Sequence, residues 1–156
     1  MRPVQSWLDE YAESHQNSLN IIIHWICVPL IMFSIIGLLA NIRLYIPFLD
    51  AYSQYSHMGF VLIFLGSLYY LFLSKSLFLG MLPVSIFMLY SIQLISNQNY
   101  SLLKISLTIF ILSWIGQFYG HKVEGKKPSF FKDIQFLMIG PLWLLSKLYK
   151  KLGIRF

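Results

Sequence analysis

The sequence has few charged residues and only one cysteine. Charged residues make up 12% of its 156 residues, whereas a soluble domain of this size carries roughly 25%. The single cysteine, Cys27, excludes a disulfide framework within the chain. Acidic residues are scarcer than basic ones, with six against twelve, which gives a net charge of +6. Most basic residues flank apolar runs, so membrane topology explains their excess better than nucleic-acid binding does.

Long hydrophobic runs take the place of the missing charges. Hydrophobic residues make up 57% of the chain, and four runs approach the roughly 20 residues that a bilayer-spanning helix needs. These runs cover about residues 20–40, 57–74, 76–95 and 102–120. A fifth run, residues 134–145, is too short to span and contains Gly140 and Pro141, so we expect a re-entrant or interfacial helix there. A complete fifth span is the less favoured alternative.

The first residues of the chain predict a short amphipathic helix over residues 4–14. Val4, Trp7, Leu8 and Tyr11 recur at helical spacing and form one apolar stripe. The start of the chain is polar and partly acidic, so we expect no cleavable signal peptide. Together these patterns predict an all-α, polytopic membrane helix bundle. It has about four transmembrane helices, an N-terminal amphipathic helix and a C-terminal re-entrant or interfacial helix, in a single domain of residues 1–156.

The distribution of lysine and arginine predicts the orientation of the bundle. With four spans, only Arg43 and Lys104 lie on one side, and the other ten basic residues lie on the opposite side. Such an excess marks the cytoplasmic side, so both termini are expected to be cytoplasmic. If residues 134–145 crossed completely, the basic residues of the tail would change sides and weaken the bias. The membrane would be the inner membrane of a bacterium or the endoplasmic reticulum of a eukaryote.

Four candidate ligands are expected to converge at the cytoplasmic end of the bundle. His15 and His24 lie at the start of the first span, and His121 and Glu124 lie at the end of the fourth. His121 and Glu124 are three residues apart, so they share one face of a helix. His57 starts the second span on the other side, where an ordinary structural role is the favoured interpretation.

Imidazole and carboxylate together suit a divalent first-row metal, and histidines with one carboxylate and open positions are typical of non-haem ferrous oxygenases. Asn20, one turn before His24, is a candidate to orient its imidazole, and Gln117 is a weaker candidate. The alternative is that each histidine is an ordinary interfacial residue, and that Glu124 pairs with Lys122 or Lys127 on a solvated face.

Two blocks of residues resemble a known family. The first block is Trp7, Tyr11, His15, Asn20, His24 and Pro29. The second is Trp114, Gln117, Gly120, His121, Glu124, Gly125 and Pro128, with a later Gly140-Pro141. As a pair, these blocks resemble the 2-hydroxy fatty acid dioxygenase family, small membrane proteins long catalogued as a domain of unknown function. Ser18 departs from the pattern, since the family tends to have proline there.

The resemblance implies an iron(II)-dependent oxidation of long-chain 2-hydroxy fatty acids with O2, which shortens the chain by one carbon. It assigns the metal and the chemistry to His15, His24 and His121, with Glu124 as the less certain member. An α-hydroxy acid can chelate a metal while its alkyl tail stays among the membrane helices and lipids, so the site is expected at the membrane surface. Lys122 and Lys126 are candidates to attract the substrate carboxylate.

Two other classes of function remain open at this point. One is a haem-binding electron carrier that uses His24 and His121 as axial ligands. The other is a non-enzymatic membrane scaffold or a metal transporter. A transporter would need polar groups deeper in the spans, and apart from Gln93 and serine residues the spans contain few.

Overall fold

Helices are the main secondary structure of the described part of the chain. The structure, a computed structural model, describes residues 3–45, 53–98, 100–125 and 130–156, with only the backbone of residues 130–135. Its helices are α1 (Val4–Glu13), α2 (Ser18–Ala40), α3 (Met58–Leu73), α4 (Lys75–Ser96), α5 (Leu102–Glu124) and α6 (Phe130–Leu152). No strand forms among these residues, and one isolated bridge joins Arg43 to His57. The all-α class predicted from the sequence is confirmed.

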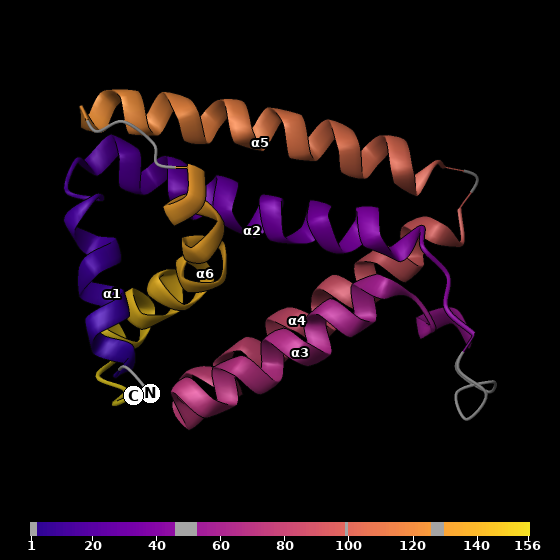
Figure 1. Ribbon diagram of the computed structural model, residues 1–156, viewed down its shortest axis with the longest axis horizontal. Coiled ribbons are helices and arrows are strands. Elements are labelled where there is room, and N and C mark those ends of the chain that lie inside the picture. The colour runs from indigo at the N-terminus through magenta and orange to yellow at the C-terminus, as the bar shows by residue number, and fades with distance from the viewer. Residues whose placement is uncertain (1–2, 46–52, 99, 126–129) are drawn as a thin grey trace.

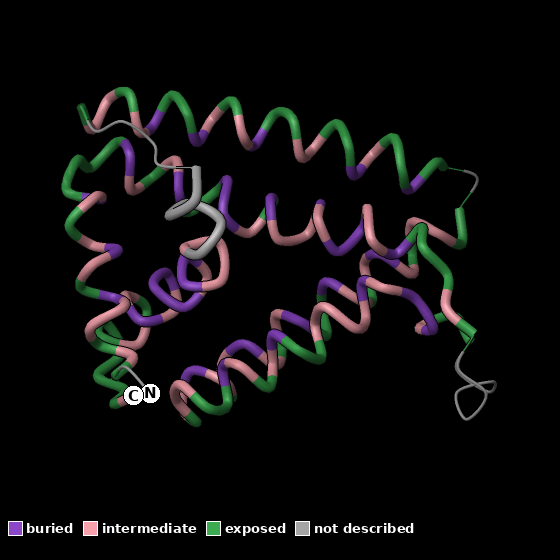
Figure 2. The backbone as a smooth tube through the Cα atoms, viewed as in Figure 1, coloured by how far each residue is buried: buried purple, intermediate pink, exposed green. Residues whose placement is uncertain are grey.

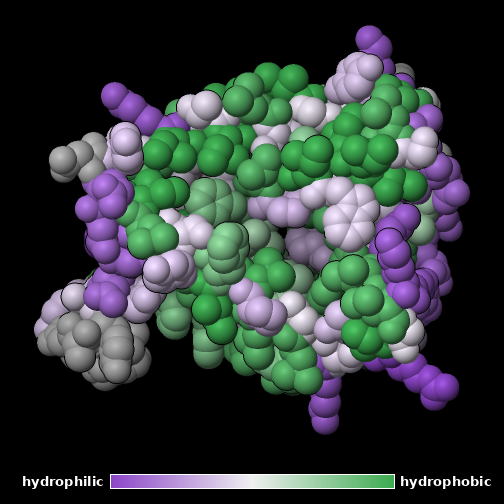
Figure 3. All heavy atoms as spheres, turned by 180° about the vertical axis from the view of Figure 1, so that it is seen from behind, coloured by the Kyte–Doolittle hydropathy of each residue, from purple (hydrophilic) through white to green (hydrophobic). Residues whose placement is uncertain are grey.

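Three of the helices are long and apolar enough to cross a membrane: α2, α4 and α5. Helix α3 is also apolar but has 16 residues, so a fourth crossing stays a prediction. Large hydrophobic side chains point outward from these helices, including Ile26, Phe87 and Leu112, each more than half exposed. The space-filling view shows a broad hydrophobic band with hydrophilic side chains at its two edges (Figure 3). Such a surface is stable in lipid and not in water.

The helices form two long pairs closed at one end by α1 and α6 (Figure 1). Helices α2 and α5 run side by side over their whole length, and α3 and α4 form the second pair at an angle to the first. Helices α1 and α6 pack on each other, and α6 also contacts α2 and α4. The N- and C-terminal ends therefore lie close together at the same end of the molecule.

Small residues bring α2 and α5 into close antiparallel contact. A Cβ on Gly37 would meet the hydroxyl group of Ser106, and a Cβ on Gly120 would meet the side-chain oxygen of Asn20. Close backbone approach through small residues is the usual way in which membrane helices associate. The antiparallel register places the start of α2 against the end of α5, which is where the candidate ligands are concentrated.

Helix α1 has the amphipathic character predicted for it. Leu8 and Tyr11, from its apolar stripe, are buried in a cluster that also contains Trp143 of α6. The ring of Tyr11 lies 5.3 Å from that of Phe136 and 5.1 Å from that of Trp143, centroid to centroid. Figure 2 shows the buried faces of α1 and α6 turned toward each other. Helix α1 is therefore held to the bundle by α6.

The last helix is longer than the sequence predicted. The expected short helix over residues 134–145 is part of α6, which has 23 residues and continues through Pro141. Proline removes one backbone donor, and a helix can continue when its neighbours stabilise it. Gly140 supplies such a contact, because a Cβ there would lie 3.1 Å from the hydroxyl oxygen of Tyr11 and 3.4 Å from a methyl group of Val28.

Helix α2 begins at a capped turn that follows a four-residue connector. This connector, residues 14–17, joins α1 to α2. The side chain of Asn17 accepts hydrogen bonds from the backbone N–H groups of Leu19 and Asn20, as expected of a helix N-cap. Ser18 is the first residue of α2, a position where proline is favoured. Serine at this position is therefore compatible with the same helix start.

An apolar cleft lies between α2, α3, α4 and α6. Its space is about 570 Å³ including the open mouth, and its walls include Met32, Ile63, Gly66 and Met138. The hydroxyl group of Tyr70 faces this region and donates a hydrogen bond of 2.9 Å to the carbonyl oxygen of Met138. The lining contains none of the chain's histidines, so the cleft is separate from the candidate ligands.

Candidate metal centre

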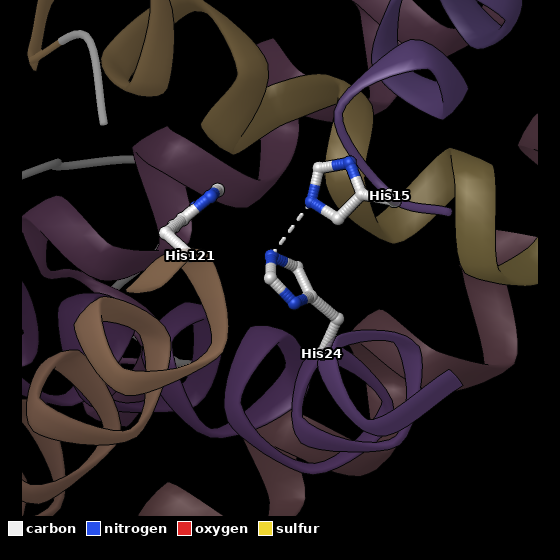
Figure 4. Close-up of side chains that lie close together, drawn as sticks. All are labelled: His15, His24 and His121. Carbon is white, nitrogen blue, oxygen red and sulfur yellow. Dashed lines mark hydrogen bonds between the residues drawn. The ribbon is translucent and has the colours of Figure 1, made fainter. Parts of the chain in front are cut away.

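Three histidines from three different segments meet at one point. His15 lies in the connector, His24 in the second turn of α2 and His121 in the last turn of α5. One ring nitrogen from each lies within 4.8 Å of the others. The ring centroids of His24 and His121 are 5.3 Å apart, although about a hundred residues separate them in the sequence. Figure 4 shows the three rings turned toward a common centre.

Backbone carbonyls determine which ring nitrogen carries the proton in His15 and His24. Nδ1 of His15 lies 2.6 Å from the carbonyl oxygen of Tyr11, and Nδ1 of His24 lies 2.9 Å from that of Asn20. A carbonyl oxygen can only accept, so each Nδ1 is the donor and each Nε2 keeps its lone pair. The two Nε2 atoms nevertheless lie 2.8 Å apart, along the dashed line of Figure 4. Two lone pairs at this distance repel unless a cation lies between them.

At neutral pH, the cation between the Nε2 atoms of His15 and His24 is not a proton. His15 is 5% exposed, and desolvation lowers the pKa of its imidazole to about 4, against the opposing effect of the hydrogen bond to the Tyr11 carbonyl. The ring is therefore neutral at physiological pH, which is the state in which imidazole binds metals. The two facing nitrogens therefore favour a bound metal ion. His15 is already neutral before a metal binds, because burial lowers the pKa of its imidazole.

The metal-free protein is expected to lose stability as the pH falls from about 6.5 to about 4. The unfolded chain binds a proton at His15 near pH 6.5, whereas the folded chain does so only near pH 4. The unfolded state thus holds more protons in this window, so acid favours it. Thermal unfolding in detergent with a chelator, from neutral pH to about pH 4, measures the effect. The His15→Gln variant should show a shallower loss, and an equal loss would contradict the prediction.

Two aromatic side chains pack against the ring of His15. The ring of Tyr11 stacks on it at a centroid distance of 4.1 Å and an interplanar angle of 2°. The ring of Trp143, from α6, lies 5.2 Å away. The sequence pattern gives neither residue a role at the site, although Tyr11 lies four residues before His15, the spacing that places its carbonyl within reach. No sequence signal pointed to Trp143.

Glu124, expected as a fourth ligand, has partners in the connector. Its Oε1 atom accepts a hydrogen bond of 2.8 Å from the backbone N–H of Gln16. Its Oε2 atom accepts two bonds of 2.9 Å, from the backbone N–H of Asn17 and from the side-chain amide of Asn20. The structure does not bring Glu124 into the group of ligand atoms that the three histidines form. Its carboxylate instead ties the end of α5 to the connector that carries His15.

Asn20 and Gln117 both lie close to the histidines. Asn20 is fully buried and has two roles. Its backbone carbonyl oxygen accepts a hydrogen bond from Nδ1 of His24, and its side-chain amide donates one to the carboxylate of Glu124. Gln117 is buried one turn before His121 on α5, and its Oε1 atom has no hydrogen-bond partner among the described residues. A buried amide oxygen of this kind costs free energy.

The remaining candidates lie elsewhere or outside the described residues. Lys122 is exposed on the last turn of α5, and Lys126 falls in the part of the chain that the structure does not describe. His57 lies before α3, where its Nδ1 atom accepts a hydrogen bond of 3.1 Å from the backbone N–H of Phe60. It is a buried helix cap. The structural role favoured from the sequence agrees with this contact.

The comparison with known proteins assigns a family. A model described as "2-hydroxy-palmitic acid dioxygenase Mpo1-like" matches residues 1–152. The chain belongs to the Mpo1-like family. One Mpo1-like relative is 2-hydroxy-palmitic acid dioxygenase MPO1 of Saccharomyces cerevisiae, 31% identical over 154 residues, which cover 96% of this chain and 82% of the relative. No solved structure matches the chain. The resemblance drawn from the two sequence blocks is confirmed.

Proposed function

We propose that this protein is an iron(II)-dependent dioxygenase that uses O2 to shorten long-chain 2-hydroxy fatty acids by one carbon. One observation carries the proposal: Nε2 of His15 and Nε2 of His24 lie 2.8 Å apart, while the Nδ1 atom of each ring faces a backbone carbonyl oxygen that can only accept. Such a pair needs a cation. The substrate class comes from the name of the yeast relative, a 2-hydroxy-palmitic acid dioxygenase.

The donor set suits a ferrous ion. Two nitrogen ligands about 2.1 Å from one ion and at right angles to each other lie about 3 Å apart, close to the 2.8 Å between His15 and His24. Three imidazoles leave coordination positions for the substrate and for O2. When bound, iron supplies Lewis acidity and the O2 chemistry that no amino-acid side chain provides.

The residues of the chain prepare the site before any substrate arrives. The carbonyls of Tyr11 and Asn20 hold the Nδ1 protons of His15 and His24, which keeps both Nε2 lone pairs directed at one point. The rings of Tyr11 and Trp143 exclude water from one side of His15. The substrate would place its hydroxyl and carboxylate groups at this centre and leave its alkyl chain among the apolar helices.

The geometry argues against the haem alternative. A haem held by His24 and His121 would place its ring between their coordinating nitrogens. Nε2 of His24 already faces Nε2 of His15 at 2.8 Å, and the three ligand atoms lie within 4.8 Å of one another. The imidazole of His15 therefore occupies the space beside the His24 nitrogen that the planar macrocycle would need. An ultraviolet–visible spectrum of the purified protein should show no Soret band.

Metal analysis tests the proposal directly. Protein purified in detergent should contain about one iron per chain, and chelation should abolish turnover of a long-chain 2-hydroxy fatty acid. Ferrous iron added back should restore turnover, whereas zinc, which fits similar ligands but has no redox chemistry, should not. Protein that turns the substrate over with no bound metal would refute the proposal.

We also propose that the centre lies at the cytoplasmic surface of the membrane. The basic residues of the chain are concentrated on the side of the bundle that carries both termini under a four-span topology. The histidines lie at the same end of α2 and α5 as helix α1. Cysteines introduced at exposed positions of α1 should react with impermeant reagents only from the cytoplasmic side.

A further inference from the structure

Lys147 of α6 is placed to act on the site although no comparison or sequence motif assigns it a role. Its Nζ atom lies 4.2 Å from the centroid of the Trp143 ring. That ring in turn lies 5.2 Å from the ring of His15. The ammonium group therefore lies beside an aromatic ring that contacts the candidate metal centre.

The direction of the side chain follows from helix geometry. Side chains on an α-helix lean toward its N-terminus and meet residues three or four positions earlier. Lys147 lies four residues after Trp143, so its chain runs back over the indole ring, on the side of α6 that packs against α1. The aromatic face attracts the ammonium group and holds it near the site, away from open solvent.

Lys147 also lacks an anionic partner. Burial lowers the pKa of its ammonium group, and no carboxylate among the described residues forms an ion pair with it. A partly desolvated cation that packs on an aromatic ring and feels a second positive charge, that of Lys150, gains free energy when an anion arrives. Lys122, the candidate from the sequence analysis, is exposed on the last turn of α5 and already has water around it. Lys147 is thus the better-placed cation for a charged ligand.

We propose that Lys147 binds the carboxylate group of the substrate and so selects acids over neutral lipids of the same chain length. This inference rests on the proposed function, which requires an acidic substrate with its head group at the three histidines. Lys147 would be a specificity-determining residue that contacts the substrate. The ligand it recognises is the carboxylate of a long-chain acid that enters from the membrane.

The test compares an acid with its uncharged analogue. Binding of a radiolabelled long-chain fatty acid and of the alcohol of equal length would be measured on wild-type protein and on Lys147→Gln, with and without chelator. The acid should bind about tenfold more weakly or worse to Lys147→Gln, because a charge-assisted hydrogen bond is lost. Binding of the alcohol should not change. Lys147→Arg should keep the preference for the acid, because it keeps the cation.

The control is Lys150→Gln, which removes an exposed charge from the same helix and should leave the binding of both lipids unchanged. Equal losses for acid and alcohol, no loss for either, or the same loss in Lys150→Gln would each overturn the proposal. A different result would refute the proposed function: wild-type protein that contains no iron or does not turn over the substrate. Binding to chelated protein does not require turnover, so the two failures are distinguishable.

Discussion

Replacement of His24 by alanine is expected to remove the bound metal and to lower turnover of a long-chain 2-hydroxy fatty acid by at least about 100-fold, since even residues that only support a metal ligand cost 10–100-fold. His24 is 1% exposed and presents its Nε2 atom to that of His15 at 2.8 Å. The variant leaves His15 and His121 with no third imidazole. Metal content per chain and turnover rate, measured on the same preparation, report both effects.

The matched control for this variant is His57→Asn. His57 is also buried, but it caps α3 and lies outside the three-histidine group. Asparagine is a good N-cap, so this variant should keep the helix start. Metal content and turnover should stay near those of wild-type protein. If His24→Ala kept its metal, or if His57→Asn lost it equally, the assignment of the centre to His24 would be wrong.

Much of the fold follows from two sequence patterns. Long apolar runs predicted helices whose bounds differ from the observed ones by a few residues, as with residues 20–40 and α2, Ser18–Ala40. The meeting of His15, His24 and His121 follows from the same runs, because antiparallel helices bring the start of one against the end of the other. Helix length and membrane thickness therefore predicted a proximity that the sequence separation alone does not suggest.

The length of α6 could not be predicted from hydropathy. Hydropathy predicts only a short run over residues 134–145, which Gly140-Pro141 interrupts. An amphipathic helix does not need a continuous apolar run, since only one face is buried. The stabilising contacts come from another part of the chain, where Tyr11 and Val28 pack against Gly140. Hydropathy windows do not detect such tertiary contacts.

The role of Glu124 was obscured for a related reason. The spacing from His121 correctly placed both residues on one helix face, but it did not show what the carboxylate meets there. Its partners include the backbone N–H groups of Gln16 and Asn17. Every residue except proline has such a group, so the sequence carries no signal for it. The carboxylate oxygens are directed at the connector rather than at the nitrogens of the three histidines.

Replacement of Glu124 by alanine is accordingly expected to weaken metal binding by about 10–100-fold without removing a ligand, the usual effect of losing a supporting residue. The change deletes all three hydrogen bonds that tie α5 to the connector and to Asn20. His15, whose segment loses this anchor, would sample positions away from His24. Titration of chelated protein with ferrous iron measures the affinity, and saturating iron should restore most of the turnover.

Measurements at saturating metal distinguish a residue that positions a metal ligand from a residue that is itself a metal ligand. If Glu124 positions His15, a cobalt-substituted Glu124→Ala protein at full occupancy should have the same electronic spectrum as substituted wild-type protein, because the ligand set is unchanged. A changed spectrum, with turnover that excess iron does not restore, would make Glu124 a ligand. Gln16→Ala is the matched control, because it keeps the backbone N–H that donates to Glu124 and should bind metal normally. The decisive contact thus belongs to the peptide group and not to the side chain of Gln16.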